Sequence, residues 1–314
     1  MHSKANTQTK IRIGTRGSKL ALAQSHELRQ RLSAAHGLTP DDFEITIIKT
    51  SGDLIQDKAL SSFGGKGLFT KEIEDALLAN EIDLAVHSMK DMPTKLPAGL
   101  VIPCFLPRED VRDAFISLKV KHMADLPQGA VLGTSSLRRQ AQVMRMRPDL
   151  KVVLYRGNVD TRLRKLEEGV ADATLLASAG LRRLGLESHI ASLISTDEML
   201  PAVAQGAIGV ETREGDERIG ALLAPLNDPD TALCVTAERA FLEQLDGSCR
   251  TPIGGLAELK DGRLRFRGQI LTPDGKQSHE TERNGTPADA VAMGVDAATE
   301  LLKAAGPDFF CTVA

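Results

Sequence analysis

Residues 130–139, Ala-Val-Leu-Gly-Thr-Ser-Ser-Leu-Arg-Arg, join an apolar run to the start of an amphipathic segment. The apolar part predicts a strand, and the small polar residues after it predict that a helix begins near Ser135. The same alternation of short apolar runs and amphipathic stretches fills the first two thirds of the chain. This rhythm is typical of βαβ units and therefore predicts an α/β fold.

Outward from this stretch, the pattern divides the chain into three units. In the first unit we expect strands over 10–14, 43–49 and 82–87, helices over 18–35 and 68–80, and a loop over 50–67. The second unit begins near Glu109, after Pro103 and Pro107, with strands over 130–133, 151–155 and 172–177 and helices that begin near Ser135, Val159 and Ser178. Ligands of open α/β sheets bind where strands end and helices begin, so these junctions are the candidate site.

The last third of the chain predicts a different architecture. Residues 201–211 are expected to cross back to the first unit and form a strand there. A helix over 227–245, strands over 254–259, 263–271 and 277–283, and a closing helix over 287–305 predict a small α+β unit. We therefore expect three domains: 1–105 with 200–224, then 106–199, then 225–314.

Composition excludes several classes of protein. The chain of 314 residues has 42% hydrophobic and 26% charged residues, as in ordinary globular proteins. It has no apolar run of the ~20 residues that span a membrane, and its polar first ten residues lack a signal-peptide core, so we expect a cytoplasmic protein. The spacing of its cysteines and histidines predicts neither a metal site nor a disulfide framework. With no Trp and one Tyr, it lacks the aromatic platforms that stack nucleic-acid bases.

Positive charge is concentrated in one segment. Residues 138–183 contain nine arginines and two lysines against five acidic residues, a balance of +6 in a chain whose net charge is -3. Guanidinium groups bind carboxylates and phosphates in a fixed bidentate geometry, so this segment predicts an anion site. The alternative is a set of solvated helix faces, which we expect for Arg145, Arg147, Arg164 and Arg182.

A second cluster follows the strand predicted at 82–87, where His87, Ser88, Lys90 and Asp91 precede Pro93. A carboxylate beside a lysine and an arginine-rich surface stays ionised, so Asp91 could stabilise a cation or transfer a proton. The alternative is that Asp91 only caps the next turn. We expect His87 to be a packed histidine rather than a catalyst.

A third cluster is the loop Asp246-Gly247-Ser248-Cys249-Arg250. A cysteine at a loop tip beside an arginine is accessible, and the neighbouring charge favours its reactive thiolate. The other cysteines, Cys104, Cys234 and Cys311, are expected to be small buried residues.

Two further motifs belong to the first unit. Arg16 lies at a strand-to-helix junction, and Ser18 is expected to cap the helix that follows. The glycine-rich run 62–67 is not a P-loop, and we interpret it as a mobile flap that carries Lys66 or, alternatively, as an ordinary surface loop.

Taken in order, these motifs resemble those of the porphobilinogen deaminase (hydroxymethylbilane synthase) family. The matching runs are Thr15-Arg16-Gly17-Ser18, Gly64-Gly65-Lys66-Gly67-Leu68-Phe69, Ala85-Val86-His87-Ser88-Met89-Lys90-Asp91, Gly133-Thr134-Ser135-Ser136-Leu137-Arg138-Arg139-Gln140, Arg156-Gly157-Asn158, Gly206-Ala207-Ile208-Gly209, and Cys249 with Pro252-Ile253-Gly254. The resemblance runs from about Ile11 to the C-terminus. One departure is Ser248, where the family commonly has glycine before the cysteine.

The resemblance implies a function and a fold. Its members deaminate porphobilinogen and condense four units head to tail on a dipyrromethane cofactor, from which the linear tetrapyrrole is released by hydrolysis. This is a transferase reaction of tetrapyrrole, porphyrin and heme biosynthesis. The implied fold has two domains like the halves of periplasmic binding proteins, with a cleft between them, and a third that presents the cysteine loop. We expect a monomer without nucleic-acid or membrane partners.

The resemblance also assigns roles to particular residues. Cys249 matches the cofactor attachment site through a thioether, and Asp91 matches the catalytic carboxylate. Lys66 matches the flexible loop. The residues that match those binding the carboxylates of cofactor and substrate are Arg16, Ser18, Lys90, Thr134, Ser135, Ser136, Arg138, Arg139, Arg156, Arg162 and Arg183.

Two other classes of function compete with this interpretation. A two-domain anion-binding protein or ligand-responsive regulator explains the arginines and the βαβ rhythm, but not the exposed Cys249 or Asp91. A nucleic-acid-binding protein is disfavoured by the missing aromatic residues and the negative net charge. Only the enzyme is expected to be heavier than its sequence mass, because only the enzyme carries a covalent dipyrromethane.

Overall fold

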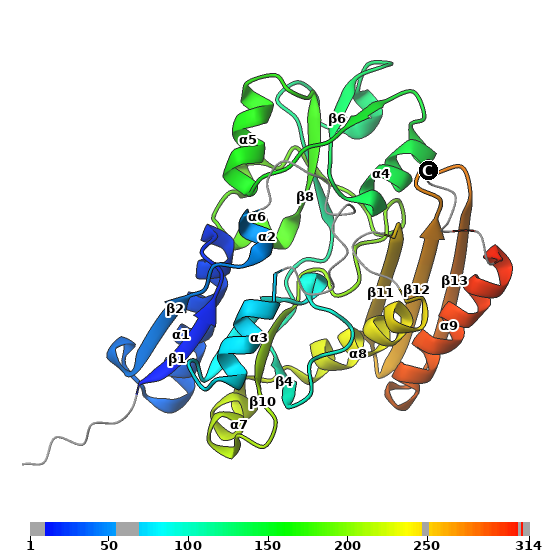
Figure 1. Cartoon of the computed structure of the whole chain (residues 1–314). Helices are drawn as coiled ribbons and strands as arrows, with labels where there is room; N and C mark the ends of the chain where they lie inside the picture. Colours follow the sequence, from blue (N-terminus) through cyan, green and yellow to red (C-terminus); the bar gives the residue numbers. More distant parts are fainter. Residues whose placement is uncertain (1–9, 55–68, 247–250, 307–308, 310–314) are drawn as a thin grey trace, which may run out of the picture.

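The computed structural model describes residues 10–54, 69–246, 251–306 and 309, and these residues form three separate sheets (Figure 1). Two sheets have five strands and are flanked by helices, and the third has three strands. The predicted class, α/β with a small C-terminal α+β part, is confirmed. Short 3₁₀ helices are η1 (Pro40–Asp42), η3 (Met89–Asp91), η4 (Met123–Asp125), η5 (Glu187–His189), η6 (Ala224–Leu226) and η7 (Pro287–Asp289).

The first sheet has the order β2-β1-β3-β10-β4. Its strands are β1 (Ile11–Thr15), β2 (Phe43–Ile47), β3 (Leu84–Ser88), β4 (Leu100–Phe105) and β10 (Ile208–Arg213). The associated helices are α1 (Lys19–His36), α2 (Ser51–Leu54), α3 (Lys71–Leu78) and α7 (Glu217–Leu223). β1 is parallel to β2 and β3, whereas β10 is antiparallel to β3 and β4. The predicted return of the chain to the first unit is therefore confirmed by β10.

The second sheet repeats this arrangement with the order β7-β6-β8-β5-β9. Its strands are β5 (Asp113–Ile116), β6 (Val131–Gly133), β7 (Lys151–Val153), β8 (Ala173–Ala177) and β9 (Ser192–Leu193), and its helices are α4 (Leu137–Met146), α5 (Val159–Glu167) and α6 (Ser178–Arg183). β6 is parallel to β7 and β8, and β5 is antiparallel to β8. The carboxyl ends of the parallel strands therefore lead into α4, α5 and α6, as the sequence predicts.

Sequence reasoning missed β4, β5 and β9. Pro103 suggested a break in the chain, but it lies within β4, which is an edge strand and can lose one backbone donor. β5 and β9 are very short, so they show no period that distinguishes a strand from a loop. α2 likewise forms where a loop was expected.

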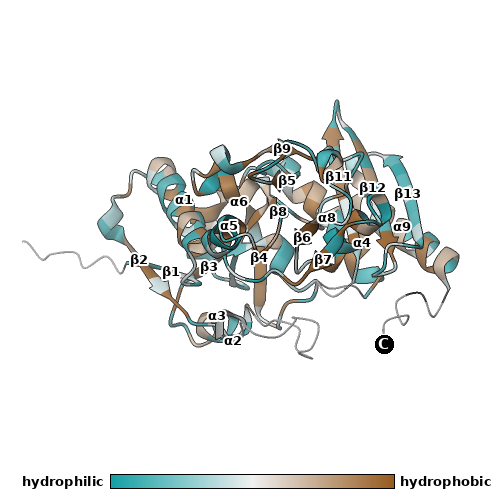
Figure 2. Ribbon diagram, turned by 90° about the horizontal axis from the view of Figure 1, so that it is seen from above, coloured by the Kyte–Doolittle hydropathy of each residue, from teal (hydrophilic) through white to brown (hydrophobic). Residues whose placement is uncertain are grey.

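The C-terminal sheet is an antiparallel meander of β11 (Ile253–Lys260), β12 (Arg263–Leu271) and β13 (Ser278–Gly285). α8 (Pro229–Gln244) and α9 (Ala290–Ala305) pack against it, and the rings of Phe241 and Phe266 lie 5.0 Å apart in their shared core. Gly294 permits close helix packing, because a Cβ there would lie 2.3 Å from the carbonyl oxygen of Ala237. β13 is largely hydrophilic, as expected for a strand at the edge (Figure 2).

Two crossing segments connect the first and second sheets, and α8 binds both. Arg108 of the first crossing forms a bidentate pair with Glu238, with nitrogen–oxygen distances of 2.7 and 3.0 Å. Glu238 also accepts hydrogen bonds from the N–H groups of Ala204 in the second crossing and of Ala257 in β11. One buried carboxylate therefore joins all three sheet units.

Among the helices of the described segments, none combines the length and apolar character needed to cross a membrane. That part of the chain also contains no group of three or more His, Cys, Asp or Glu side chains suited to a metal ion.

Candidate active site

The turn between β6 and α4 holds three of the predicted ligand-binding hydroxyl groups. Ser136 caps α4, and its Oγ accepts a hydrogen bond from the Arg139 N–H. Thr134 Oγ1 accepts from the Ser136 N–H at 3.2 Å, and Ser135 Oγ accepts from the Tyr155 N–H at 3.1 Å. Each hydroxyl accepts a bond within the protein and still has a proton that it can donate to an anion.

Arg138 and Arg139 converge on one buried carboxylate, that of Asp113 in β5. Arg138 Nη1 lies 2.8 Å from Asp113 Oδ2, and Arg139 Nη2 lies 2.7 Å from Asp113 Oδ1. Burial alone would raise the pKa of Asp113, but the two guanidinium groups hold it well below its usual range. Asp113 therefore stays ionised. Sequence reasoning missed it, because its short strand was not recognised.

The two arginines differ in their remaining donors. All three guanidinium nitrogen atoms of Arg139 already donate a hydrogen bond, since its Nε and Nη2 bind Asp113 and its Nη1 donates to the Leu175 carbonyl at 2.9 Å. Arg138 Nη1 donates to the Leu200 carbonyl at 2.7 Å, but its buried Nε has no acceptor in the described part of the chain. An unpaired buried donor in the first turn of the helix that follows the serine and threonine hydroxyls fits a carboxylate group, as a polycarboxylate cofactor requires.

Lys90 and Asp91 lie in η3, directly after β3, and the Met89 N–H donates to the Ala207 carbonyl. Burial lowers the pKa of Lys90 to about 8; Asp91 opposes this shift, whereas Arg139 adds to it. The charge of Lys90, which follows a strand of the first sheet, is therefore near enough to interact with the arginines of α4 in the second sheet unit. Asp91 itself is exposed.

Arg162 of α5 also belongs to the charged cluster of Lys90, Asp91 and Arg139. Burial, together with the charges of Arg139 and Arg156, lowers its pKa to about 10, while Tyr155 and Asp91 act in the opposite direction. Its Nε donates to the Gly157 carbonyl at 2.9 Å. Gly157 has φ 124°, a conformation that disfavours any side chain, so it fixes the turn that positions Arg162.

The start of α1 faces the start of α5. The predicted cap is confirmed, because Ser18 Oγ accepts from the Ala21 N–H. Lys19 Nζ lies 3.1 Å from Asp160 Oδ2 and so links the first turns of the two helices. Arg16 stacks on the Phe69 ring with its guanidinium carbon 4.2 Å from the ring centroid. These contacts place Arg16 and Ser18 at the end of the first sheet that faces the second.

Arg183 already binds protein groups. Its Nε lies 3.3 Å from Glu27 Oε2, and its Nη2 donates to the Gly206 carbonyl at 3.0 Å. It thereby connects α6 to α1 and to the second crossing segment. Its predicted role in binding a ligand carboxylate stays a prediction.

Cys249 and Lys66 lie outside the described residues, so their predicted roles are not addressed by the structure. The chain just after residues 247–250 packs against the second crossing. The Gly255 N–H donates to the Pro201 carbonyl at 3.0 Å, and Gly254 packs against Leu200. Because the Leu200 carbonyl accepts from Arg138, the start of β11 lies near the arginines of α4.

Several expectations about other residues are confirmed. Cys104 and Cys234 are buried, and burial raises the pKa of their thiols to about 12 and about 11. Cys311 lies outside the described residues. His87 is a packed histidine, with its Nε2 2.9 Å from Glu211 Oε2. Arg145, Arg164 and Arg182 are exposed.

The expectation for Arg147 is wrong. Its guanidinium pairs with Asp149 at 2.7 Å and donates to the carbonyls of Met123 and Leu126 at 2.9 Å. Arg147 therefore closes the loop before β6 instead of lying on a solvated face. A helical wheel could not reveal this, since Arg147 follows α4 and its acceptors come from an irregular loop.

Comparisons with known proteins agree on one family. The family model "Porphobilinogen deaminase, dipyromethane cofactor binding domain" matches residues 11–221, and "Porphobilinogen deaminase, C-terminal domain" matches residues 232–303. The chain is 64% identical over 303 residues to the porphobilinogen deaminase of Paracoccus denitrificans, covering 96% of this chain and 97% of that protein. It is 58% identical over 310 residues to that of Nitrobacter hamburgensis, covering 99% and 98%.

Solved structures of lower similarity were also found. A periplasmic substrate-binding protein of an ABC transporter from Coxiella burnetii has a TM-score of 0.42 and 15% identity, covering 71% of this chain and 94% of that one. The methionine-binding protein MetQ has a TM-score of 0.43 and 13% identity, covering 70% and 89%. The family models and the relatives, by contrast, extend over nearly the whole chain, which therefore belongs to the porphobilinogen deaminase family.

Proposed function

We propose that this chain is a hydroxymethylbilane synthase, a transferase of tetrapyrrole biosynthesis. It deaminates four porphobilinogen molecules, condenses them head to tail on a dipyrromethane bound to Cys249, and releases the linear tetrapyrrole by hydrolysis. The observation that carries this proposal is the buried Arg138 Nε, which has no acceptor among the described residues and belongs to a cluster of cationic side chains beside the carboxylate of Asp91.

The cationic residues bind the substrate's side groups. Each porphobilinogen carries an acetate and a propionate, so a growing chain brings many carboxylates that need fixed donors. We assign this role to Arg16, Ser18, Lys90, Thr134, Ser135, Ser136, Arg138, Arg139, Arg156, Arg162 and Arg183. Each guanidinium nitrogen atom of Arg139 already donates to Asp113 or Leu175, which leaves it the second N–H groups of Nη1 and Nη2, whereas Arg138 also has its unpaired Nε among the described residues.

Asp91 stabilises the positive charge that forms on the substrate and transfers protons. When bound, the dipyrromethane supplies the free pyrrole α-carbon on which the chain grows. Loss of ammonia from porphobilinogen leaves positive charge on the substrate, which the surrounding arginines oppose. Asp91 is exposed beside these cations, so its carboxylate can stabilise that charge and accept or donate a proton at the pyrrole N–H.

We further propose three domains, residues 1–105 with 200–224, 106–199 and 225–314. Each contains one of the three sheets, and α8 joins them through Glu238. Domain movement about the two crossings would make room for the chain as it lengthens, and Lys66 would lie in a flexible loop. We also propose that the protein acts as a monomer in the cytoplasm, without nucleic-acid partners; a solution mass near 33.7 kDa tests the monomer.

The function is tested by two measurements on the purified chain. Its intact mass should exceed the sequence mass by one covalent dipyrromethane, and added porphobilinogen should be consumed with release of ammonia. A protein of bare sequence mass that leaves porphobilinogen unchanged, even after prolonged incubation with it, would contradict the proposal.

A further inference from the structure

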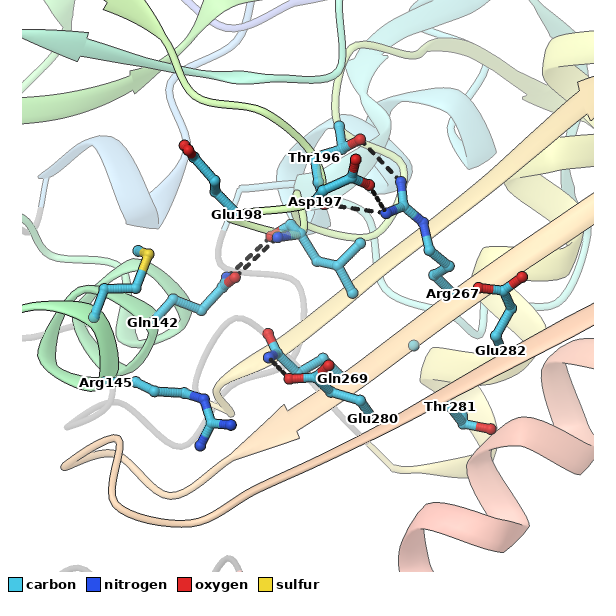
Figure 3. Close-up of a pocket in the computed structure, with 13 residues that line it drawn as sticks. Gln142, Arg145, Thr196, Asp197, Glu198, Arg267, Gln269, Glu280, Thr281 and Glu282 are labelled. Carbon is cyan, nitrogen blue, oxygen red and sulfur yellow. Dashed lines mark hydrogen bonds and ion pairs between the residues drawn. The ribbon is translucent and has the colours of Figure 1, made fainter. Parts of the chain in front are cut away.

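A polar cavity of about 470 Å³ lies between the second sheet unit and the C-terminal sheet. It is lined by Gln142 and Arg145 of α4, the segment 196–200, and residues of β12 and β13 such as Arg267, Gln269 and Glu280 (Figure 3). None of the residues assigned above to the active site lines it. Its volume falls within the range of small-molecule sites.

Two arginines of the cavity lining, Arg145 of α4 and Arg267 of β12, have hydrogen-bond donors that the described part of the protein does not use. Arg145 is exposed, and its guanidinium has no acceptor among the described residues. Arg267 binds Thr196, Asp197 and Glu258 through its Nη atoms, but its buried Nε has no partner in that part of the chain. The exposed guanidinium of Arg145 fits a ligand with an anionic acceptor, whereas Arg267 Nε is buried.

The wall formed by β12 and β13 offers acceptors instead. Gln269 is 7% exposed, and its Nε2 donates to Glu280 Oε1 at 2.8 Å. Its Oε1 is buried without a donor in the described chain. A buried amide oxygen without a donor costs free energy, so a ligand N–H group would be stabilised there.

The balance of charge selects the kind of ligand. Arg267 pairs with Asp197 and Glu258, and Glu282 pairs with Arg265. Among the described lining residues, Arg145 is then the cation without an ion pair, and Glu198 and Glu280 are carboxylates without one. A simple anion would be repelled by the two glutamates, and a simple cation by Arg145. A ligand with both charges suits the cavity.

We propose that this cavity is a binding site for a small zwitterion with adjacent carboxylate and ammonium groups, such as a polar α-amino acid. The carboxylate binds Arg145, and the ammonium donates to Gln269 Oε1 beside Glu280 (Figure 3). The bound molecule joins α4, which carries Arg138 and Arg139, to the C-terminal sheet. It would thereby stabilise the packing of the second unit against the third.

The test uses isothermal titration of the cofactor-loaded protein with L-glutamine and with glycine. Saturable binding is expected for both. N-acetyl-L-glutamine, which lacks the ammonium, and L-glutamine amide, which lacks the carboxylate, should bind at least roughly tenfold more weakly, since each loses a charge-assisted contact. Failure of both L-glutamine and glycine to bind overturns the proposal, as does equal binding of the two modified analogues.

Single substitutions test whether L-glutamine binds in this cavity. Arg145→Ala should weaken L-glutamine binding roughly tenfold to a hundredfold without changing porphobilinogen turnover. Arg164→Ala, a matched change at an exposed arginine of α5 outside the cavity, should leave both unchanged. Gln269→Leu should also weaken binding, with circular dichroism to confirm that the variant is folded. If L-glutamine binds Arg145→Ala as tightly as the native protein, the ligand lies elsewhere and the assignment is wrong.

Discussion

Asp113 Oδ2 lies 2.8 Å from Arg138 Nη1, with 0% and 4% of the two side chains exposed. Asp113 also binds Arg139 and accepts a hydrogen bond from Gln205 Nε2 at 3.0 Å. Gln205 belongs to the second crossing between the sheet units. One ionised carboxylate therefore sets the positions of both arginines relative to the second crossing, and it compensates part of their charge when no substrate carboxylate is present.

Removal of this carboxylate charge should be costly. Asp113→Asn leaves two buried guanidinium groups uncompensated, so unfolding free energy should fall by about 3–5 kcal/mol, and cofactor-free protein should accumulate. Urea unfolding and intact mass measure the two effects. Asp296→Asn is the control, because Asp296 pairs with Arg283 while 69% exposed; it should cost under about 1 kcal/mol. Equal losses in the two variants would argue against a positioning role for Asp113.

Cofactor attachment should depend on one cysteine. Cys249→Ser should give protein of bare sequence mass and no porphobilinogen consumption, because the hydroxyl cannot replace the thiol. Cys104→Ser and Cys234→Ser should keep the added mass, since those thiols are buried and their raised pKa values keep them protonated. Cys311→Ser should keep it as well. Peptide mapping that finds the adduct on another cysteine would refute the assignment.

Asp91 should matter for its charge. Asp91→Asn keeps the size of the side chain and removes the charge, so cofactor should still be bound while condensation nearly stops. Asp91→Glu keeps the charge but displaces it, and a misplacement of about 1 Å can cost roughly a hundredfold in rate, so partial activity is expected. Single-turnover release of ammonia, with cofactor content verified by mass, measures both. If Asp91→Asn releases ammonia as fast as the native protein, Asp91 only caps the turn and has no catalytic role.

Lys90 should make the cofactor-free protein sensitive to pH. Its folded pKa, about 8, is below the ordinary value of 10.5, so the unfolded chain binds more protons between these values. The penalty for burying the charge is therefore complete below about pH 8 and is relieved as the pH rises toward 10.5.

Lys90→Met, made in the Cys249→Ser background, removes that penalty. It should raise the melting temperature most below about pH 8, and the gain should shrink as the pH rises toward 10.5. Lys90→Arg stays charged and should show no such decline. In cofactor-loaded protein the Lys90→Met gain should be smaller, because cofactor carboxylates favour the charged lysine. If the gain in melting temperature of cofactor-free Lys90→Met did not depend on pH, the lowered pKa of Lys90 would be contradicted.

Arg147 should contribute to stability rather than to activity. Arg147→Ala removes the pair with Asp149 and the hydrogen bonds to the Met123 and Leu126 carbonyls, so a loss of about 1–3 kcal/mol in unfolding free energy is expected. Turnover by the folded fraction should be unchanged. Arg164→Ala removes a single exposed pair with Glu168 and should cost under about 1 kcal/mol. If Arg147→Ala is as stable as Arg164→Ala, the observed contacts do not stabilise the loop.

Local patterns in the sequence predicted most of the regular elements. The caps at Ser18 and Ser136 and the apolar runs of β1, β3 and β8 follow from interactions among neighbours in the chain, which a short window of sequence contains. The same patterns placed the arginines and the hydroxyl groups at strand-to-helix junctions. These patterns failed to predict β4 and β5. β4 is an edge strand that contains Pro103, and β5 is too short to show an alternation of buried and exposed residues.

The sequence by itself thus determined the types of element, the motifs and the side chains available for binding carboxylates. Only the tertiary structure decided which of those side chains already bind protein groups: Arg139 donates to Asp113 through Nε and Nη2, Arg147 closes a loop, and Arg138 keeps a buried donor without an acceptor among the described residues. These outcomes depend on partners far apart in the chain, such as Asp113 and Leu200. Burial and charge compensation are properties of the packed molecule, because solvent exclusion requires both sheets, the two crossings and α8 to be in place.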